Sequence, residues 1–211
     1  MTEPGMTQPN AFHDLDRFVV RQKLTVMVNR YEILRADESF NPGELLAFAE
    51  QKRMAFKEQV TFFTDAAKQN PLFGFKARKR IDLGSGYDVT DAAGAPVGWF
   101  KKEFGASLLN STWRLAEAQG GPEFVGKERN QKVAIARRVW DMVPIVGEIP
   151  VPFLFHFDFV GPDGGVVLSS TKKAGIKDVY RVETPAASNG WRLDWRLAAS
   201  MAVALDALQS R

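Results

Sequence analysis

Few residues of this chain can carry out acid–base, nucleophilic or metal chemistry. Its 211 residues include no cysteine and two histidines, His13 and His156. A cysteine nucleophile, a thiolate zinc site, a disulfide framework and a three-histidine metal site are therefore excluded. His156 stands two residues before Asp158, so the two would share one face of a strand, where a carboxylate can orient an imidazole. No nucleophile is nearby in the sequence, so we interpret His156 as structural or solvent-facing and expect no catalytic residue, metal or cofactor.

Basic residues gather in four places, and the first two lie beside aromatic side chains. If the segment FKARKR is extended, Lys76, Arg78 and Arg80 share one face. A second group follows the pair Trp99-Phe100. Basic groups suit an anionic lipid surface, where each contributes about 1 kcal/mol. The candidate anion or lipid contacts are therefore Lys76, Arg78, Lys79, Arg80, Lys101 and Lys102.

The same residues have a simpler interpretation as charged strand ends that keep sheet edges from pairing with other chains. Two further basic groups occur later in the sequence, at Lys127, Arg129, Lys132, Arg137 and Arg138, and at Lys172, Lys173 and Lys177. Whether these groups share one side of the fold decides between the two interpretations.

Composition and charge are those of an ordinary soluble globular protein, with 45% hydrophobic and 25% charged residues and a net charge of +3. This charge is too small to indicate nucleic acid by itself. Charge-free stretches are at most about ten residues long, whereas a bilayer span takes about 20 apolar residues. Residues 1–15 lack the pattern of a secretory signal, so we expect a flexible leader, a single domain over 16–211 and a cytoplasmic location.

Short apolar segments between glycines and prolines predict many β-strands, and such a pattern is typical of a sandwich or a barrel. The expected strands are Phe18–Asn29, Arg30–Ala36, Glu44–Gln51, Ala55–Thr64, Leu72–Arg78, Tyr87–Asp91, Pro96–Lys101, Ser107–Leu115, Phe153–Val160, Val166–Ser170 and Asp178–Glu183.

One hairpin pattern occurs three times, as an aromatic–acid–apolar strand, a glycine turn and a further apolar strand. The copies are YEI (31–33) with NPG (41–43), YDV (87–89) with DAAG (91–94), and FDF (157–159) with GPDG (161–164). Aspartate bonds its own backbone in such turns and glycine adopts positive φ. The repetition predicts a duplicated antiparallel sheet, with ordinary hairpin composition as the alternative.

The C-terminal segment predicts a helix that is apolar on every side. One stripe holds Leu197, Met201, Leu205 and Leu208, and no face is charged. A helix of this kind is either buried or in a membrane. The twelve residues from Leu197 to Leu208, of which only Ser200 and Asp206 are polar, span about 18 Å, well short of the roughly 30 Å of a hydrocarbon layer. We therefore expect it in a protein core, and a second, short helix over Asn130–Trp140.

These elements predict a mainly β fold, a single antiparallel sheet system wrapped around one central C-terminal helix. The alternative is an α+β domain with the helix on one sheet face. That arrangement requires a polar outer stripe, which the segment after Leu197 lacks.

In this order of hairpins and terminal helix, the chain resembles the tubby-like superfamily, and more closely its phospholipid scramblase and LURP-one-related branch. The similarity extends from about Phe18 to Leu208. The segments that carry it are RYEILRAD, GELLAFAEQKRMAFKEQVTFF, GYDVTDAAGAPVGWFKKEFGASLLNSTWRL, IPVPFLFHFDF and WRLDWRLAASMAVALDALQSR. The resemblance implies a closed antiparallel barrel of about twelve strands around a central C-terminal helix.

The resemblance also implies a class of function. Tubby-type members bind phosphoinositide head groups, and scramblases are associated with calcium-dependent lipid movement and palmitoylated cysteines. This chain has no cysteine and no Asp-x-Asp-x-Asp-Gly calcium loop. We expect a non-enzymatic barrel that binds an anionic phospholipid head group or apolar ligand, or docks peripherally at the membrane surface. The alternatives are a protein-interaction or regulatory scaffold and, more weakly, nucleic-acid binding.

Overall fold

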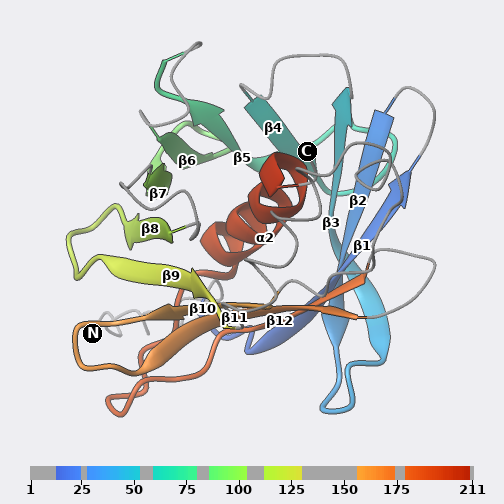
Figure 1. Ribbon diagram of the computed structural model, residues 1–211. Coiled ribbons are helices and arrows are strands. Elements are labelled where there is room, and N and C mark those ends of the chain that lie inside the picture. Colours follow the sequence, from blue (N-terminus) through green and yellow to red (C-terminus); the bar gives the residue numbers. More distant parts are fainter. Residues whose placement is uncertain are drawn as a thin grey trace, which may run out of the picture.

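The chain forms a closed antiparallel barrel with one helix through its middle, as the computed structural model shows (Figure 1). The structure describes residues 13–24, 28–52, 59–79, 86–103, 112–129, 156–173 and 179–209. Around the barrel the strands follow the order β1-β12-β11-β10-β9-β8-β7-β6-β5-β4-β3-β2. Closure pairs β1 with both β2 and β12, so no strand keeps an open edge. The predicted fold class is confirmed.

The twelve strands are short and joined in sequence. They are β1 (Arg17–Leu24), β2 (Val28–Ala36), β3 (Pro42–Lys52), β4 (Gln59–Phe63), β5 (Pro71–Ala77), β6 (Tyr87–Asp91), β7 (Pro96–Glu103), β8 (Thr112–Glu117), β9 (Phe124–Glu128), β10 (His156–Val160), β11 (Val166–Lys173) and β12 (Val179–Glu183). The helix is α2 (Trp195–Gln209). Because successive strands alternate in direction, the described connections 37–41, 64–70, 92–95, 118–123, 161–165 and 184–194 all leave the same end of the barrel.

Two strand predictions are wrong. The predicted boundary at Asn29 fails because β2 already begins at Val28. The strand β9 was not expected, since its sequence FVGKE contains a glycine and two charged residues. Its inward side nevertheless fits the barrel, because the ring of Phe159 fills the space where a side chain on Gly126 would lie. The predicted helix over 130–140 lies outside the described residues.

The three predicted hairpins share one turn geometry. In each, the first turn residue (Asp37, Asp91 or Gly161) bonds through its backbone N–H to the carbonyl four residues on, and its own carbonyl accepts from the residue three on. The residue three on has positive φ: Gly94 at 86°, Gly164 at 80°, and in the first copy Phe40 at 60°. The first turn therefore lies at 37–41, ahead of the glycine that the pattern selected.

The helix α2 lies in the barrel core. Leu197, Met201 and Leu205 are buried, as are the alanines between them, while the side chain of Leu208 lies outside the described residues. Gly98 on β7 permits this close packing, since a Cβ there would lie 2.8 Å from a methyl carbon of Leu197. The helix begins at a cap, where the Asp194 carboxylate accepts the backbone N–H of Arg196 at 2.8 Å.

Only the last part of the predicted leader lies within the described residues. His13 contacts the segment that precedes α2, and Leu15 is buried in the core. The leader boundary at residue 15 stays a prediction, since residues 1–12 lie outside the described part of the chain.

Candidate functional site

The structure places two of the predicted lipid contacts beside one tryptophan and a third nearby, on the outer face of β5, β6 and β7. The Arg78 guanidinium carbon lies 5.4 Å from the Trp99 ring centre, and Lys101 Nζ lies 5.8 Å from it. Lys76 is exposed in register with Asp88, which in turn pairs with Trp99. We call Lys76, Arg78, Asp88, Trp99 and Lys101 the Trp99 patch.

An acidic residue lies within this patch. Arg78 donates from Nε and Nη2 to the same Oδ1 of Asp88, at 2.9 and 2.7 Å. Both side chains are substantially exposed, at 40% and 53%. An exposed pair of this kind contributes little to stability, so it can exchange partners with a ligand.

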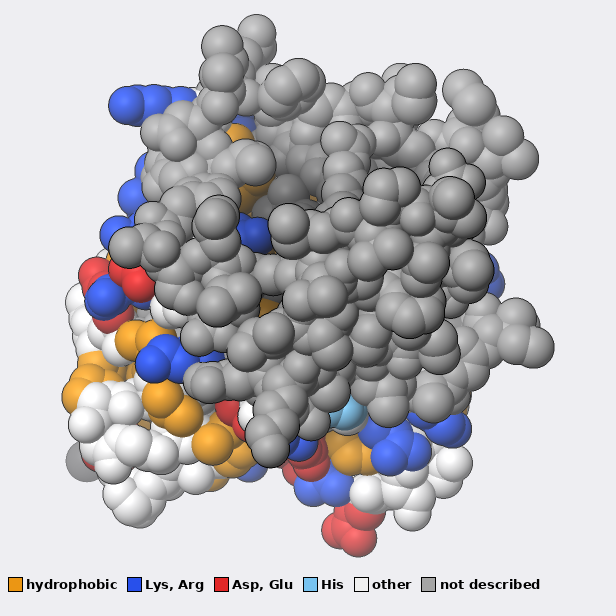
Figure 2. Space-filling view, viewed as in Figure 1, with side chains coloured by type: hydrophobic (Ala, Val, Ile, Leu, Met, Phe, Trp, Pro, Cys, Tyr) orange, Lys and Arg blue, Asp and Glu red, His pale blue; other side chains and the backbone are white. Residues whose placement is uncertain are grey.

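Of the remaining candidates, Lys102 lies away from the Trp99 patch. Lys102 alternates to the inward side of β7 and places its Nζ 5.8 Å from the ring centre of Trp113, which is buried. Lys79 is exposed at the end of β5, and Arg80 lies outside the described residues. Figure 2 likewise shows described Lys and Arg side chains spread over separate parts of the visible face, with acidic side chains beside them.

In the predicted histidine–carboxylate pair, the carboxylate of Asp158 bonds to Arg129 and not to His156. Asp158 accepts from Arg129 at 2.6 and 2.5 Å, and Arg129 also donates to Ser169 at 3.0 Å. Burial raises the pKa of Asp158, but the hydrogen bonds from Arg129 and Ser169 outweigh it and hold the pKa below its ordinary value. Burial and the nearby Arg129 charge lower the pKa of His156. Asp158 is therefore part of an ion pair and does not orient the imidazole.

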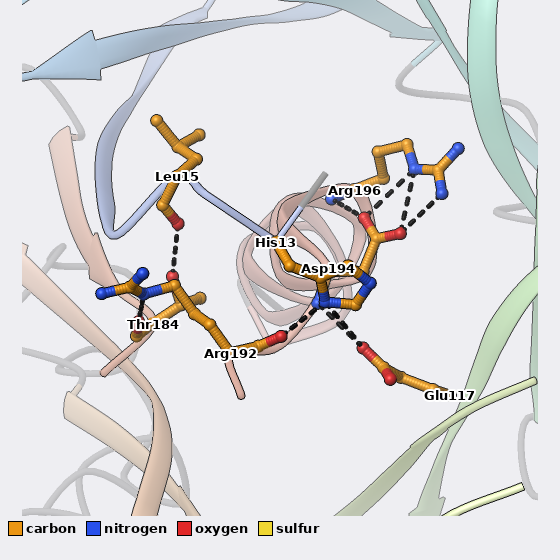
Figure 3. Close-up of polar contacts among 7 residues, drawn as sticks. All are labelled: His13, Leu15, Glu117, Thr184, Arg192, Asp194 and Arg196. Carbon is orange, nitrogen blue, oxygen red and sulfur yellow. Dashed lines mark hydrogen bonds and ion pairs between the residues drawn. The ribbon is translucent and has the colours of Figure 1, made fainter. Parts of the chain in front are cut away.

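A second cluster, which the sequence did not indicate, lies where α2 begins (Figure 3). Glu117, at the end of β8, accepts the backbone N–H of Asp194 at 2.9 Å. His13 Nδ1 lies 2.5 Å from the carbonyl oxygen of Arg192 and 3.8 Å from the Glu117 carboxylate. The Asp194 carboxylate also pairs with Arg196 at 2.6 Å. These contacts join the N-terminal segment, β8 and the start of the helix.

The same cluster continues toward β12. Arg192 Nε donates to the carbonyl of Thr184 at 2.7 Å, and the Thr184 hydroxyl donates to the carbonyl of Leu15 at 2.7 Å. The cluster therefore ties the ends of strands on both sides of α2 to the segment that precedes it.

Glu117 is a member of this cluster whose pKa is shifted from its ordinary value. Burial raises its pKa, against the hydrogen bonds from the Asp194 backbone and the Trp191 side chain and the attraction of His13. An acid whose pKa is raised mainly by desolvation is a recurrent feature of functional sites.

Beside Glu117 the connections 118–123, 161–165 and 184–191 enclose an open pocket of about 500 Å³, which we call the loop pocket. The stacked rings of Phe124 and Trp191 line it, with centres 5.5 Å apart and planes 20° apart. Asp163 and Asn189 lie at its rim. A concave site with aromatic walls and few polar groups is the usual form of a small-molecule pocket.

The opposite end of α2 holds a buried polar set. Asp206 accepts hydrogen bonds from the hydroxyls of Tyr31, at 2.9 Å, and Tyr180. Gln22 donates to Tyr31 at 3.3 Å. Burial and then the Asp206 charge raise the pKa of Tyr31, which keeps the phenol protonated. Between Leu197 and Leu208 only Ser200 and Asp206 are polar, and the isolation of Asp206 there is the signal by which the sequence could have indicated this set.

Across the described ranges, no three His, Asp or Glu side chains lie close enough together to hold a metal ion. Within those ranges, no helix combines the length and the apolar character needed to cross a membrane.

The closed twelve-strand barrel around a buried helix defines the protein as a tubby-like barrel. A family model described as LURP-one-related matches residues 45–206, which is most of the chain. The chain therefore belongs to the LURP-one-related family, a family of barrels that are generally non-enzymatic. No curated protein matches the sequence.

Proposed function

We propose that this barrel is a non-enzymatic binding protein that docks at an anionic phospholipid surface through the Trp99 patch. The observation that carries the proposal is the convergence of Arg78 and Lys101 on a partly exposed tryptophan. Tryptophan favours the boundary between head groups and acyl chains, and neighbouring basic groups are attracted by anionic lipid. Peripheral attachment from a cytoplasmic location is part of this proposal.

The charges of the patch support phosphate as the recognised group. The patch holds three basic side chains and the single carboxylate of Asp88, so it is positive. Arg78 meets Asp88 through its guanidinium edge, and the same edge suits a phosphate. A hollow of about 200 Å³ between β4, β5 and β6 borders Lys76 and gives room beside it for a head group.

The resemblance to the phospholipid scramblase branch supports a lipid partner. The proposed function does not include calcium-dependent lipid movement. The chain has no cysteine for acylation. Docking at the surface requires only the patch described above, and each of its basic groups contributes about 1 kcal/mol.

Vesicle flotation tests this proposal. Wild-type protein is expected to float much more strongly with vesicles of phosphatidylcholine and phosphatidylserine than with vesicles of phosphatidylcholine alone. The triple variant Lys76→Gln/Arg78→Gln/Lys101→Gln is expected to bind at least about tenfold more weakly, since three groups together contribute about 3 kcal/mol before Asp88 is discounted.

A matched control removes equal charge elsewhere. Arg35, Lys127 and Lys173 are exposed and lie outside the patch, so Arg35→Gln/Lys127→Gln/Lys173→Gln is expected to keep most of the binding. If wild-type protein never floats with anionic vesicles, the lipid proposal fails and the interaction scaffold replaces it. If both triple variants lose binding equally, the attraction is general charge and the Trp99 patch is not the site.

A further inference from the structure

The loop pocket has a composition opposite to that of the Trp99 patch. Its lining, as far as the described residues form it, contains two carboxylates, Glu117 and Asp163, and no lysine, arginine or histidine. Such a pocket disfavours a ligand of net negative charge and favours a positive group. Its volume of about 500 Å³ lies within the range of small-molecule sites.

The aromatic wall gives the pocket a second feature that suits a cation. Phe124 is buried and fixed beneath Trp191, whose ring is partly exposed and lines the pocket. A tryptophan face attracts cations more strongly than any other side-chain ring, and desolvated sites strengthen the effect. The stack also offers apolar surface to alkyl groups on the ligand.

The charge of Glu117 is not already matched by a strong cation. Its contacts within the described residues are the backbone N–H of Asp194, the Trp191 side chain and His13 at 3.8 Å. The nearby guanidinium groups have other partners, since Arg196 pairs with Asp194 and Arg192 donates to a backbone carbonyl. A positive ligand would therefore supply the counter-charge that this half-buried carboxylate lacks.

We propose that the loop pocket binds an organic cation, an ammonium group with alkyl substituents, with the substituents against Trp191 and the charge facing Glu117 and Asp163. This chemistry occurs in a free solute such as choline and in the head group of phosphatidylcholine. The site is separate from the Trp99 patch and is tested without anionic lipid.

Calorimetric titration of the full chain with choline tests the proposal. Choline is expected to bind, and its neutral isostere 3,3-dimethylbutan-1-ol is expected to bind at least about tenfold more weakly, since the two differ chiefly in charge. Dihexanoyl phosphatidylcholine below its micelle concentration forms a second arm. Tighter binding than choline assigns the lipid head group as the source, and weaker binding assigns the free solute.

Variants locate the site. Glu117→Gln keeps the acceptor oxygen for the Asp194 N–H, and Asp163→Asn keeps the acceptor for the Gly165 N–H of its turn. Glu117→Gln is expected to weaken choline binding about tenfold and Asp163→Asn by less, because Asp163 is exposed. The matched control Glu44→Gln neutralises an exposed carboxylate outside the pocket and is expected to change nothing.

Several results would overturn the inference. They are the absence of heat at millimolar choline, equal binding of the neutral isostere, and unchanged binding in Glu117→Gln. The triple variant of the Trp99 patch is expected to bind choline normally, so failure of the lipid proposal and failure of this one are distinguishable.

Discussion

At the N-terminal end of α2 the polar side chains are joined to one another, whereas at its C-terminal end two buried polar groups find no partner among the described residues. Asp194 accepts from both the backbone and the side chain of Arg196, and Glu117 accepts the backbone N–H of Asp194. At the other end, inward-facing strand positions hold Tyr87 and Trp113, whose hydroxyl and indole nitrogen have no hydrogen-bond partner within the part of the chain that the structure describes.

The two ends of α2 differ in how many of their buried polar groups have hydrogen-bond partners among the described residues. A buried polar group without a partner costs about 1–3 kcal/mol, so the unpaired groups of Tyr87 and Trp113 lower the stability of the fold. At the same end the contact of Asp206 with Tyr31 and Tyr180 ties the helix to the barrel wall. At the N-terminal end, the hydrogen bonds of Asp194 and Glu117 hold the start of the helix beside the loop pocket.

The largest effect is expected from a charge in the middle of the helix. Met201→Lys places an ammonium where the wild-type side chain is fully buried, and the domain is expected to unfold because the cost of an unpaired buried charge approaches its whole stability, about 5–15 kcal/mol. Circular dichroism and thermal denaturation measure this. Leu45→Lys is the control, since Leu45 is 37% exposed. A soluble Met201→Lys variant with an unchanged melting temperature would contradict the central position of α2.

The next effect concerns the C-terminal end. Asp206→Ala removes the acceptor of two buried tyrosine hydroxyls and is expected to lower the free energy of unfolding by about 2–5 kcal/mol in urea denaturation. Asp206→Asn keeps an acceptor oxygen and is expected to lose less. Equal stability of Asp206→Ala and wild type would show that this contact does not hold the helix.

At the N-terminal end a pH-dependent effect is expected from Glu117. Burial raises its pKa above the ordinary 4.5, so the folded protein binds the proton more tightly than the unfolded chain. The free energy of unfolding therefore falls as pH rises from the unfolded pKa through the folded pKa, and is greatest below this window. The stability of Glu117→Gln relative to wild type is expected to increase across the same window. A difference in the free energy of unfolding between Glu117→Gln and wild type that stays constant from pH 4 to pH 8 would refute the raised pKa of Glu117.

The smallest effect is expected from removing an unpaired hydroxyl at the C-terminal end of the helix. Tyr87→Phe removes a buried hydroxyl that has no partner and keeps the ring that stacks on Phe100 at 5.1 Å. Its effect on unfolding in urea is expected to lie between none and a gain of about 1 kcal/mol. A clear loss of stability would reveal a partner for this hydroxyl and would remove the contrast between the ends.

Much of the fold could be predicted because its signals are local. The alternation of apolar residues along each strand and the turn residues between strands appear in short windows of sequence, and so does a helix without a polar face. Strand β9 was missed because its signal is not local. The inward space at Gly126 is filled by the ring of Phe159, which belongs to the next strand.

The candidate sites could be predicted only in part. The basic residues were visible as types, but their grouping depends on strand register, which brings Arg78 and Lys101 to Trp99 and takes Lys102 to the inner side. Glu117 carried no signal in the sequence. Its neighbours in the fold come from the N-terminal segment and from the residues before α2, which are remote along the chain.

The sequence by itself determined an antiparallel sheet system, its repeated turns and the buried helix, because hydrophobic periodicity and turn chemistry act between near neighbours. Only the tertiary structure decided which charges meet, which polar groups lack partners and where an acidic aromatic pocket forms. Those features depend on how the barrel closes and on the register of each strand pair, and closure brings together residues that no short window of sequence contains.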